Sequence, residues 1–248
     1  MNKLISILNV IVVVMIIYWN YYTAAVGYNG NDIGQLSDKY GNLFTPASYA
    51  FSIWGVIFLG LIAVTGYMLI TAWKESKGSQ WISKIGWSLL IANISNGLWT
   101  WVWLLEMTGL SVCVMLVILM ALLYTLRQVI EMPVHRWLVR LPIGLYAGWI
   151  SVAIIANFAA HLNRYGWHPL LGEINWTLLM IVIATIVNIY VVRWKGIKSY
   201  GMVGAWALLA VSLRHWELIP IIQWTALVGS GAIVLSILRS FIANQKTK

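Results

Sequence analysis

The sequence predicts an all-α integral membrane protein with eight membrane-spanning helices. Of its 248 residues, 61% are hydrophobic and 9% are charged, whereas an ordinary soluble domain has about 25% charged residues. The mean hydropathy is +0.82. The apolar residues form runs of about 20, the length that crosses a bilayer, and the basic residues cluster between those runs. This clustering argues against nucleic-acid binding, although the net charge is +9.

The first apolar run, residues 4–19, has two interpretations. It follows a short basic start and precedes Thr23-Ala24-Ala25, so it resembles a signal peptide with a cleavage site. We favour a retained first helix, because the run is long for a signal peptide. The aromatic residues between positions 18 and 22 are also typical of the belt at a membrane interface.

Residues 27–45 form the longest polar segment, which is rich in Gly, Asn and Asp. Segments of this length are uncommon in compact folds unless they act as lids or binding loops. Two interpretations of residues 27–45 are consistent with this composition: a lid over a ligand site, or a plain extramembrane linker. The second helix is expected at residues 46–73, where Phe51, Trp54 and Phe58 share one face at helical spacing.

The remaining helices follow with short connections. The third covers residues 85–105 and ends at Glu106, and a tight turn at residues 107–109 leads to the fourth. The other predicted spans are residues 110–129, 141–161, 174–192, 201–213 and 218–242. The seventh span is short, so apolar length alone does not establish eight spans, and the distribution of basic residues provides a second test.

The basic residues predict the orientation. If the N-terminus is inside, every Lys and Arg except Lys39, Arg164 and Arg214 falls on the inner side of an eight-span chain. Removing one helix would disturb this alternation, which follows the positive-inside rule. We therefore expect a bacterial inner (plasma) membrane protein with both termini in the cytoplasm and residues 27–45 outside it.

The lack of Asp, Glu and Lys in the middle of the predicted spans argues against several classes of membrane protein. No Asp, Glu or Lys lies in the middle of a predicted span, whereas proton pumps, ion-coupled carriers and retinal proteins need such groups. The four histidines lie at or beyond helix ends, so no metal site is predicted. His161 has the right chemistry for a haem-like ligand, but an interfacial histidine is the favoured explanation. Cys113 is the only cysteine, so no internal disulfide forms.

The sequence feature that points to a ligand site is its high content of aromatic residues. The chain contains 16 tryptophans, more than interfacial belts require, and Trp54, Trp99 and Trp149 lie inside predicted spans. Indole faces that line a cavity suit a planar apolar ligand and contribute about 0.5–1.5 kcal/mol for each stacked pair. Helix packing also explains buried tryptophans, and composition alone favours it.

Three asparagines lie within the same spans, namely Asn93, Asn96 and Asn157. An amide without a partner is costly in apolar surroundings. Asparagines in membrane helices usually bond across helices, and each such bond contributes about 0.6 kcal/mol on average. These amides therefore either join helices or orient the polar edge of a ligand, and their spacing does not separate the two.

Three motifs occur in a fixed order along residues 1–163. Their residues are Pro46, Phe51, Trp54 and Phe58 in the second span, Asn96, Trp99 and Thr100 in the third, and Tyr146, Trp149 and Asn157 in the fifth. This order resembles the tryptophan-rich sensory protein family, also called the translocator-protein or peripheral benzodiazepine receptor family. Phe58 stands where a tyrosine is usual, and Trp101 and Leu145 replace prolines.

The resemblance implies a five-helix bundle at residues 1–163, with a pocket that opens toward the extracytoplasmic loop and binds porphyrins, other tetrapyrroles or, in some relatives, sterols. The implied ligand-binding residues are Trp54, Trp99, Trp149, Phe51, Phe58, Tyr146, Asn96, Asn157 and Pro46. The tryptophans would supply stacking surface, and the asparagines would fix helix contacts or the polar edge of the ligand. Residues 164–248 would form a three-helix membrane extension outside the five-helix pattern.

The predicted function is to bind a planar hydrophobic ligand, foremost a porphyrin or another tetrapyrrole. The protein would then sense, handle or transport this ligand. A small-solute transporter or permease, a light-dependent catalyst of porphyrin breakdown, and a scaffold without a ligand remain alternatives. No catalytic residue is assigned and an enzyme is not favoured. No cofactor is required, although a bound porphyrin or haem-like molecule is compatible with the site. The expected partners are the lipid bilayer and the planar ligand, with a homodimer left open.

Overall fold

The computed structural model describes residues 1–74, 79–167 and 170–246. Within these ranges the chain is built of helices and turns, with no strand beyond an isolated bridge between Tyr28 and Asn31. The predicted all-α fold is confirmed. Lys77, His168 and Lys248, which the sequence analysis counted, lie outside the described residues.

Each of the eight predicted spans corresponds to a long helix. Their bounds are α1 Asn2–Ala25, α3 Ile53–Trp73, α4 Gln80–Leu104, α5 Thr108–Glu131, α6 Leu141–Arg164, α7 Gly172–Lys195, α8 Lys198–Arg214 and α9 Pro220–Lys246. Of the described helices, six are long and apolar enough to cross a membrane. The other two long helices are α8, which has 17 residues, and α4, whose sequence contains several Ser and Asn residues.

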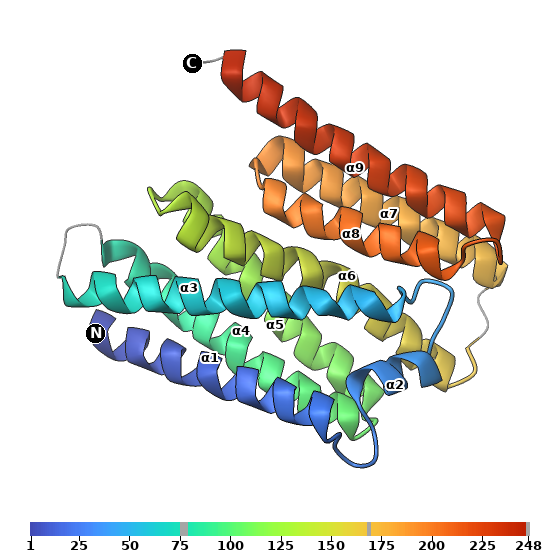
Figure 1. Cartoon of the computed structure of the whole chain (residues 1–248), viewed down its shortest axis with the longest axis horizontal. Helices are drawn as coiled ribbons and strands as arrows, with labels where there is room; N and C mark the ends of the chain where they lie inside the picture. The colour runs from blue at the N-terminus through green and yellow to red at the C-terminus, as the bar shows by residue number, and fades with distance from the viewer. Residues whose placement is uncertain (75–78, 168–169, 247–248) are drawn as a thin grey trace.

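The helices form two groups that lie side by side (Figure 1). In the first group α4 packs between α1 and α5, α6 packs against α5, and α3 packs against α1 and α6. In the second group α7, α8 and α9 pack against one another, and α8 carries most of the contact with α6. The first group corresponds to the five helices expected at residues 1–163.

Two glycines allow the close contact between the groups. A Cβ atom on Gly148 in α6 would lie 2.7 Å from the carbonyl oxygen of Tyr200 in α8. A Cβ atom on Gly144, one turn earlier, would lie 2.1 Å from the Ser199 hydroxyl oxygen. Small residues that let backbones approach closely are common at helix contacts in membranes, so these glycines explain why α8 can lie directly on α6.

The polar segment 27–45 differs from the expected loop, because it contains the short helix α2, Ile33–Lys39. The side chain of Asp32 accepts a hydrogen bond from the backbone N–H of Gln35 at 2.8 Å, and the Gln35 side chain accepts one from the Asp32 N–H at 3.2 Å. This capping box satisfies donors at the start of the helix. A second difference follows Pro46, where the 3₁₀ helix η1, Ser48–Ser52, precedes α3.

Buried polar side chains connect the helices of the first group. Asn9 in α1 donates to the carbonyl of Gly86 in α4 at 3.0 Å, and the hydroxyls of Ser88 in α4 and Thr125 in α5 lie 2.7 Å apart. Such bonds across helices satisfy groups that are costly to bury in apolar surroundings. By contrast, neither polar atom of the fully buried Asn93 side chain has a hydrogen-bond partner in the described part of the chain.

Candidate functional site

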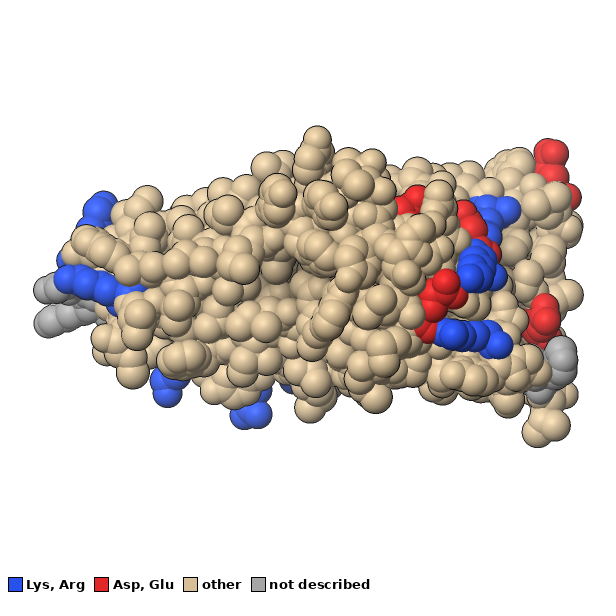
Figure 2. Space-filling view, turned by 90° about the horizontal axis from the view of Figure 1, so that it is seen from below, with Lys and Arg blue, Asp and Glu red and all other residues tan. Residues whose placement is uncertain are grey.

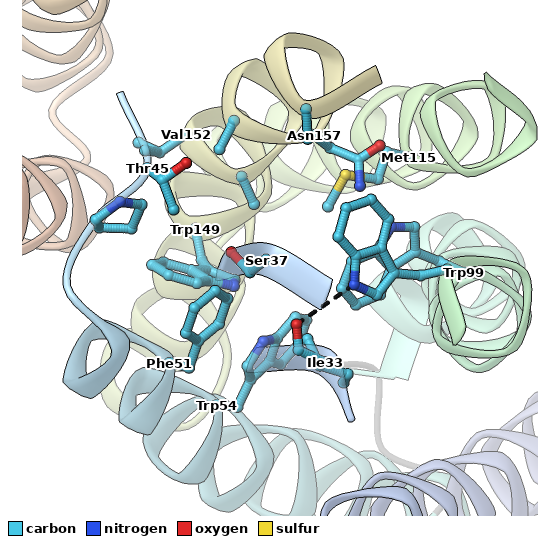
Figure 3. A pocket seen from close by; sticks show the side chains of 15 residues that line it. Ile33, Ser37, Thr45, Phe51, Trp54, Trp99, Met115, Trp149, Val152 and Asn157 are labelled. Carbon is cyan, nitrogen blue, oxygen red and sulfur yellow. Dashed lines mark hydrogen bonds between the residues drawn. The ribbon is translucent and has the colours of Figure 1, made fainter. Parts of the chain in front are cut away.

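An aromatic pocket lies beneath α2, between α3, α4, α5 and α6, with a cavity volume of about 40 Å³. Figure 3 shows Phe51, Trp54 and Trp149 on one side of this pocket, and Trp99 with Met115 on the other. One water molecule needs about 10–15 Å³ by this measure. The pocket in this structure therefore has room for only a few water molecules.

Helical spacing explains why the aromatic side chains meet. Phe51 and Trp54 are three residues apart at the junction of η1 and α3, so both face α6 and contact Trp149. The ring centroids of Phe51 and Trp149 are 5.9 Å apart, and those of Trp54 and Trp149 are 6.4 Å apart, in edge-to-face geometry. Each contact is in the range of favourable aromatic pairs. The result is a continuous aromatic wall contributed by two helices.

Six of the residues singled out from the sequence line the pocket. They are Pro46, Phe51, Trp54, Trp99, Trp149 and Asn157. Asn157 in α6 accepts a hydrogen bond from the Ser111 hydroxyl of α5 at 2.8 Å. Its amide therefore joins two helices at the edge of the pocket, which is one of the two roles that the sequence left open.

The other three, Phe58, Tyr146 and Asn96, are not in the lining. Each lies one helical turn from a lining tryptophan, on the side away from α2. Phe58 stacks on Trp54 with centroids 5.4 Å apart, and the fully buried Tyr146 contacts Trp54 edge-on at 6.0 Å. Asn96 is fully buried one turn below Trp99. Tyr146 and Asn96 are thus buried behind the wall, whereas Phe58 lines a neighbouring cavity of about 470 Å³ that shares Phe51 and Trp54 with the pocket.

The roof of the pocket comes from residues 27–45, which the sequence analysis offered as a lid without naming the residues that form it. Ile33 and Ser37 of α2 line the cavity from above, together with Trp103 of α4. The indole N–H of Trp103 donates to the Ile33 carbonyl at 3.4 Å, the dashed line in Figure 3. The capping box at Asp32 and Gln35 was the available signal for a helix here, whereas its position over the pocket is a tertiary feature.

Glu106, in the turn between α4 and α5, holds α2 in place. Its carboxylate accepts hydrogen bonds from the Lys39 ammonium at 2.7 Å, from the Tyr40 hydroxyl and from the Asn31 amide at 3.3 Å. The bonds from Lys39 and Tyr40 lower the pKa of Glu106 below its ordinary value, and Glu106 in turn raises the pKa of Lys39. The ionised pair is therefore the form that fixes α2.

We expect Glu106→Gln to loosen α2. A neutral amide cannot form the same charge-assisted bonds, so amide hydrogen exchange in residues 31–40 should become about fivefold to tenfold faster. In the wild type the pKa of Glu106 is lowered, so the stabilisation of α2 by ionised Glu106 is fully present above the ordinary glutamate pKa, near 4.5. This stabilisation is lost as the pH falls through the lower pKa that Glu106 has in the folded protein. The variant should lack this acid dependence.

Glu131→Gln is the matched control for this experiment, because among the described residues Glu131 pairs only with exposed Arg127 one turn away. Exchange in residues 31–40 should not change in the control. Equal exchange in the Glu106 variant and the wild type would show that Glu106 does not hold α2.

The segment after α2 is held by the end of α8. Arg214 donates to the Asp38 carboxylate at 3.0 Å and to the Pro46 carbonyl at 3.3 Å. The neighbouring His215 donates from Nε2 to the Leu43 carbonyl at 2.8 Å. Because Pro46 lines the pocket, these bonds connect the second helix group to the wall of the pocket.

The start of η1 is attached to the same helix. The backbone N–H of Ala47 donates to the Ala210 carbonyl at 3.1 Å, and the indole N–H of Trp206 donates to the Ala50 carbonyl at 3.2 Å. The rings of Tyr49 and Trp206 pack edge-to-face at 5.2 Å. The three-helix extension, for which the sequence suggested no role, thus supports the mouth of the pocket.

Two buried donors in the pocket wall have no partner. The indole N–H groups of Trp54 and Trp99 are inaccessible to solvent and make no hydrogen bond within the described part of the chain. Buried donors are nearly always satisfied in folded proteins. The described lining contains no Asp, Glu, His, Lys or Cys, and the described residues contain no group of three or more potential metal ligands. The pocket therefore offers aromatic surface, and its wall contains two N–H donors without a partner among the described residues.

The family of the chain follows from a comparison with known proteins. The model of the TSPO-like protein family matches residues 6–239, a stretch that includes the aromatic pocket and extends through α7 and α8 into α9. No curated protein and no solved structure matches the chain. The match thus reaches well beyond residues 1–163, on which the sequence resemblance was based. This integral membrane protein belongs to the TSPO-like protein family.

Proposed function

We propose that the aromatic pocket binds a planar hydrophobic ligand of the tetrapyrrole class. The observation that carries the proposal is the convergence of Trp54, Trp99 and Trp149 from three helices on one pocket. Two of these indoles have buried N–H groups without a partner among the described residues. Stacking surface together with free donors suits a flat apolar ring that has acceptor groups at its edge.

The size of the cavity adds a requirement to this proposal. A space of about 40 Å³ is far too small for a tetrapyrrole, so α2 and the segment around Pro46 must move for the ligand to enter. Polar contacts hold both at their edges, through Glu106 and Arg214, and the buried side chains of Leu36 and Phe44 anchor them in the core. We propose that they form a lid that opens as a unit.

The test is a titration of the detergent-purified protein with a dicarboxylic porphyrin in the dark, followed by the Soret band and by tryptophan emission. We expect saturable one-to-one binding. Trp149→Phe reduces the stacking surface and should weaken the affinity about threefold to tenfold, in line with one lost aromatic contact.

Trp194→Phe is the control, because Trp194 is 68% exposed at the end of α7 and lies outside the pocket. The control should bind like the wild type. Binding that does not saturate, or that weakens equally in both variants, would contradict the pocket as the binding site.

We also propose that the end of the bundle with the N-terminus faces the cytoplasm, in a bacterial inner membrane. In Figure 2, Lys and Arg gather at this end, on the left, without visible acidic residues, whereas Asp and Glu accompany them at the other end. This asymmetry follows the positive-inside rule and would place the pocket mouth outside the cytoplasm. In a Cys113→Ser background, a cysteine-reactive probe that does not cross membranes should fail to label a cysteine added at the N-terminus of the full chain in intact cells, and labelling there would contradict this orientation.

A further inference from the structure

A second cavity opens at the basic end of the molecule, far from the aromatic pocket. It has a volume of about 500 Å³ and lies where η3, Arg136–Arg140, and the start of α8 meet the last turns of α9. Most of its wall is apolar, and Met202, Leu238 and Phe241 in this wall are about half exposed. The cavity is therefore a groove on the lipid-facing side of the helices.

Three cations line the same groove, namely Arg136, Arg140 and Lys198. Neither Asp nor Glu is part of its described lining, and none of the three forms an ion pair with a described residue. Arg136 and Lys198 are close enough for their charges to repel each other. The groove thus concentrates positive charge without a protein anion to balance it.

One nitrogen of the Arg140 guanidinium also lacks a hydrogen-bond acceptor among the described residues. The guanidinium donates from Nη2 to the carbonyls of Val129, Ile130 and Met132, at 3.0, 3.4 and 3.5 Å, at the end of α5. Its Nε is buried and has no hydrogen-bond partner among the described residues. A buried charged donor that lacks an acceptor is costly, so an acceptor from outside the chain would stabilise this arrangement.

The cations lie at the depth where a membrane changes from hydrocarbon to headgroups. Trp137, next to Arg136, is 65% exposed, as expected for an interfacial tryptophan. The Lys198 ammonium lies 3.2 Å from the centre of the Phe241 ring, at the boundary between the apolar wall and the charged rim. Long basic side chains place their charges at this level.

We propose that this groove binds one anionic phospholipid of the surrounding bilayer. An acyl chain would lie along Met202, Val234 and Leu238, and the phosphate would accept hydrogen bonds from Arg136, Arg140 and Lys198. Basic pockets between membrane helices are suited to such headgroups. A zwitterionic headgroup fits less well, because the described lining of the groove contains no carboxylate to pair with its cationic amine. A free inorganic anion would leave the apolar wall unused.

A second lipid-facing groove within the same molecule provides a comparison. It lies between α1 and α4 and has a volume of about 590 Å³. Residues such as Met15, Ile94 and Leu98 line it, and its lining in the described part of the chain has no charged side chain. It offers similar apolar surface but nothing that selects a headgroup. Selectivity for an anionic lipid should therefore depend on the three cations and not on groove size.

The test uses the full chain in detergent, with native mass spectrometry to count bound lipids. Phosphatidylglycerol and phosphatidylcholine with identical acyl chains are added at equal concentration. We expect one retained phosphatidylglycerol per chain and a preference over phosphatidylcholine of at least about tenfold. The double variant Arg136→Gln/Lys198→Gln should lose most of this preference, at about fivefold for each cation, with its binding of phosphatidylcholine unchanged.

Two further variants make the outcome decisive. Lys84→Gln/Arg193→Gln removes two exposed cations outside the groove and should keep the preference. Met202→Trp fills the apolar wall, leaves the cations in place and should reduce retention of both lipids. Equal retention of the two lipids by the wild type, or an equal loss of preference in both double variants, would overturn the proposal. Competition by millimolar inorganic phosphate, with retention unaffected by Met202→Trp, would instead identify a simple anion site and also overturn it.

Discussion

Replacing Gly148 by alanine should lower the unfolding midpoint of the protein by about 5–10 °C. The added Cβ atom would lie 2.7 Å from the Tyr200 carbonyl oxygen and 3.1 Å from its Cα. These are backbone atoms, so no side-chain rotation relieves the overlap and α8 must move away from α6. Overpacking of this kind costs about 1–3 kcal/mol, and each kcal/mol corresponds to about 2–4 °C in a chain of this size.

Gly66→Ala in α3 is the matched control, because a Cβ atom there would meet no atom within 4 Å. Alanine favours a helix interior by about 0.8–1.0 kcal/mol relative to glycine, so the control should melt at or slightly above the wild-type temperature. Thermal unfolding in one detergent, followed by circular dichroism, compares all three proteins. Equal midpoints for Gly148→Ala and the wild type would show that α6 and α8 do not depend on this close approach.

Replacing Arg214 by leucine should make porphyrin association faster and binding tighter, each by about fivefold to thirtyfold. The substitution removes the contacts to Asp38 and to the Pro46 carbonyl. Since the Arg214 side chain is 29% exposed and that of Asp38 is 59% exposed, the ion pair itself is worth little. The hydrogen bond from the charged Arg214 guanidinium to the Pro46 carbonyl adds to the ion pair, so together they stabilise the closed position of this segment by about 1–2 kcal/mol. In the proposed mechanism a bound tetrapyrrole would already have displaced the Pro46 segment, so the dissociation rate should change little.

Stopped-flow mixing with the porphyrin used for the equilibrium titration separates the two rate constants. Arg239→Leu removes an arginine at the other end of the molecule, in α9, and should leave both rates unchanged. A slower association in the Arg214 variant, or an equal effect in both variants, would mean that the end of α8 does not restrain the pocket mouth.

The convergence of the aromatic residues is the part of the site that sequence reasoning predicted best. Phe51 and Trp54 share a helix face, and Trp149 was expected near them through the family resemblance. The structure places all three in one wall. Depth was predicted less well. Helical spacing assigns Phe58 and Tyr146 to the correct face but does not specify how far along each helix the cavity extends, and both lie one turn too deep to reach it.

The restraints on the lid could not be predicted from the sequence. The bond between Arg214 and Asp38 joins residues 176 positions apart, and that between Lys39 and Glu106 joins residues 67 apart. Such pairs depend on how helices are placed in three dimensions, whereas periodicity and capping are local signals. The charge pattern did place Lys39 and Arg214 on the same side of the membrane, which is a necessary condition for both contacts to form at one mouth.

The small volume of the aromatic cavity affects what any affinity measurement on this protein reports. If only a minority of molecules adopts a binding-competent conformation at a given moment, the observed dissociation constant equals the intrinsic one divided by that fraction. A competent population of about 1% would weaken the observed affinity about a hundredfold. A change of detergent, temperature or lipid that alters this population would then rescale the affinities of all ligands by one common factor and leave their rank order unchanged.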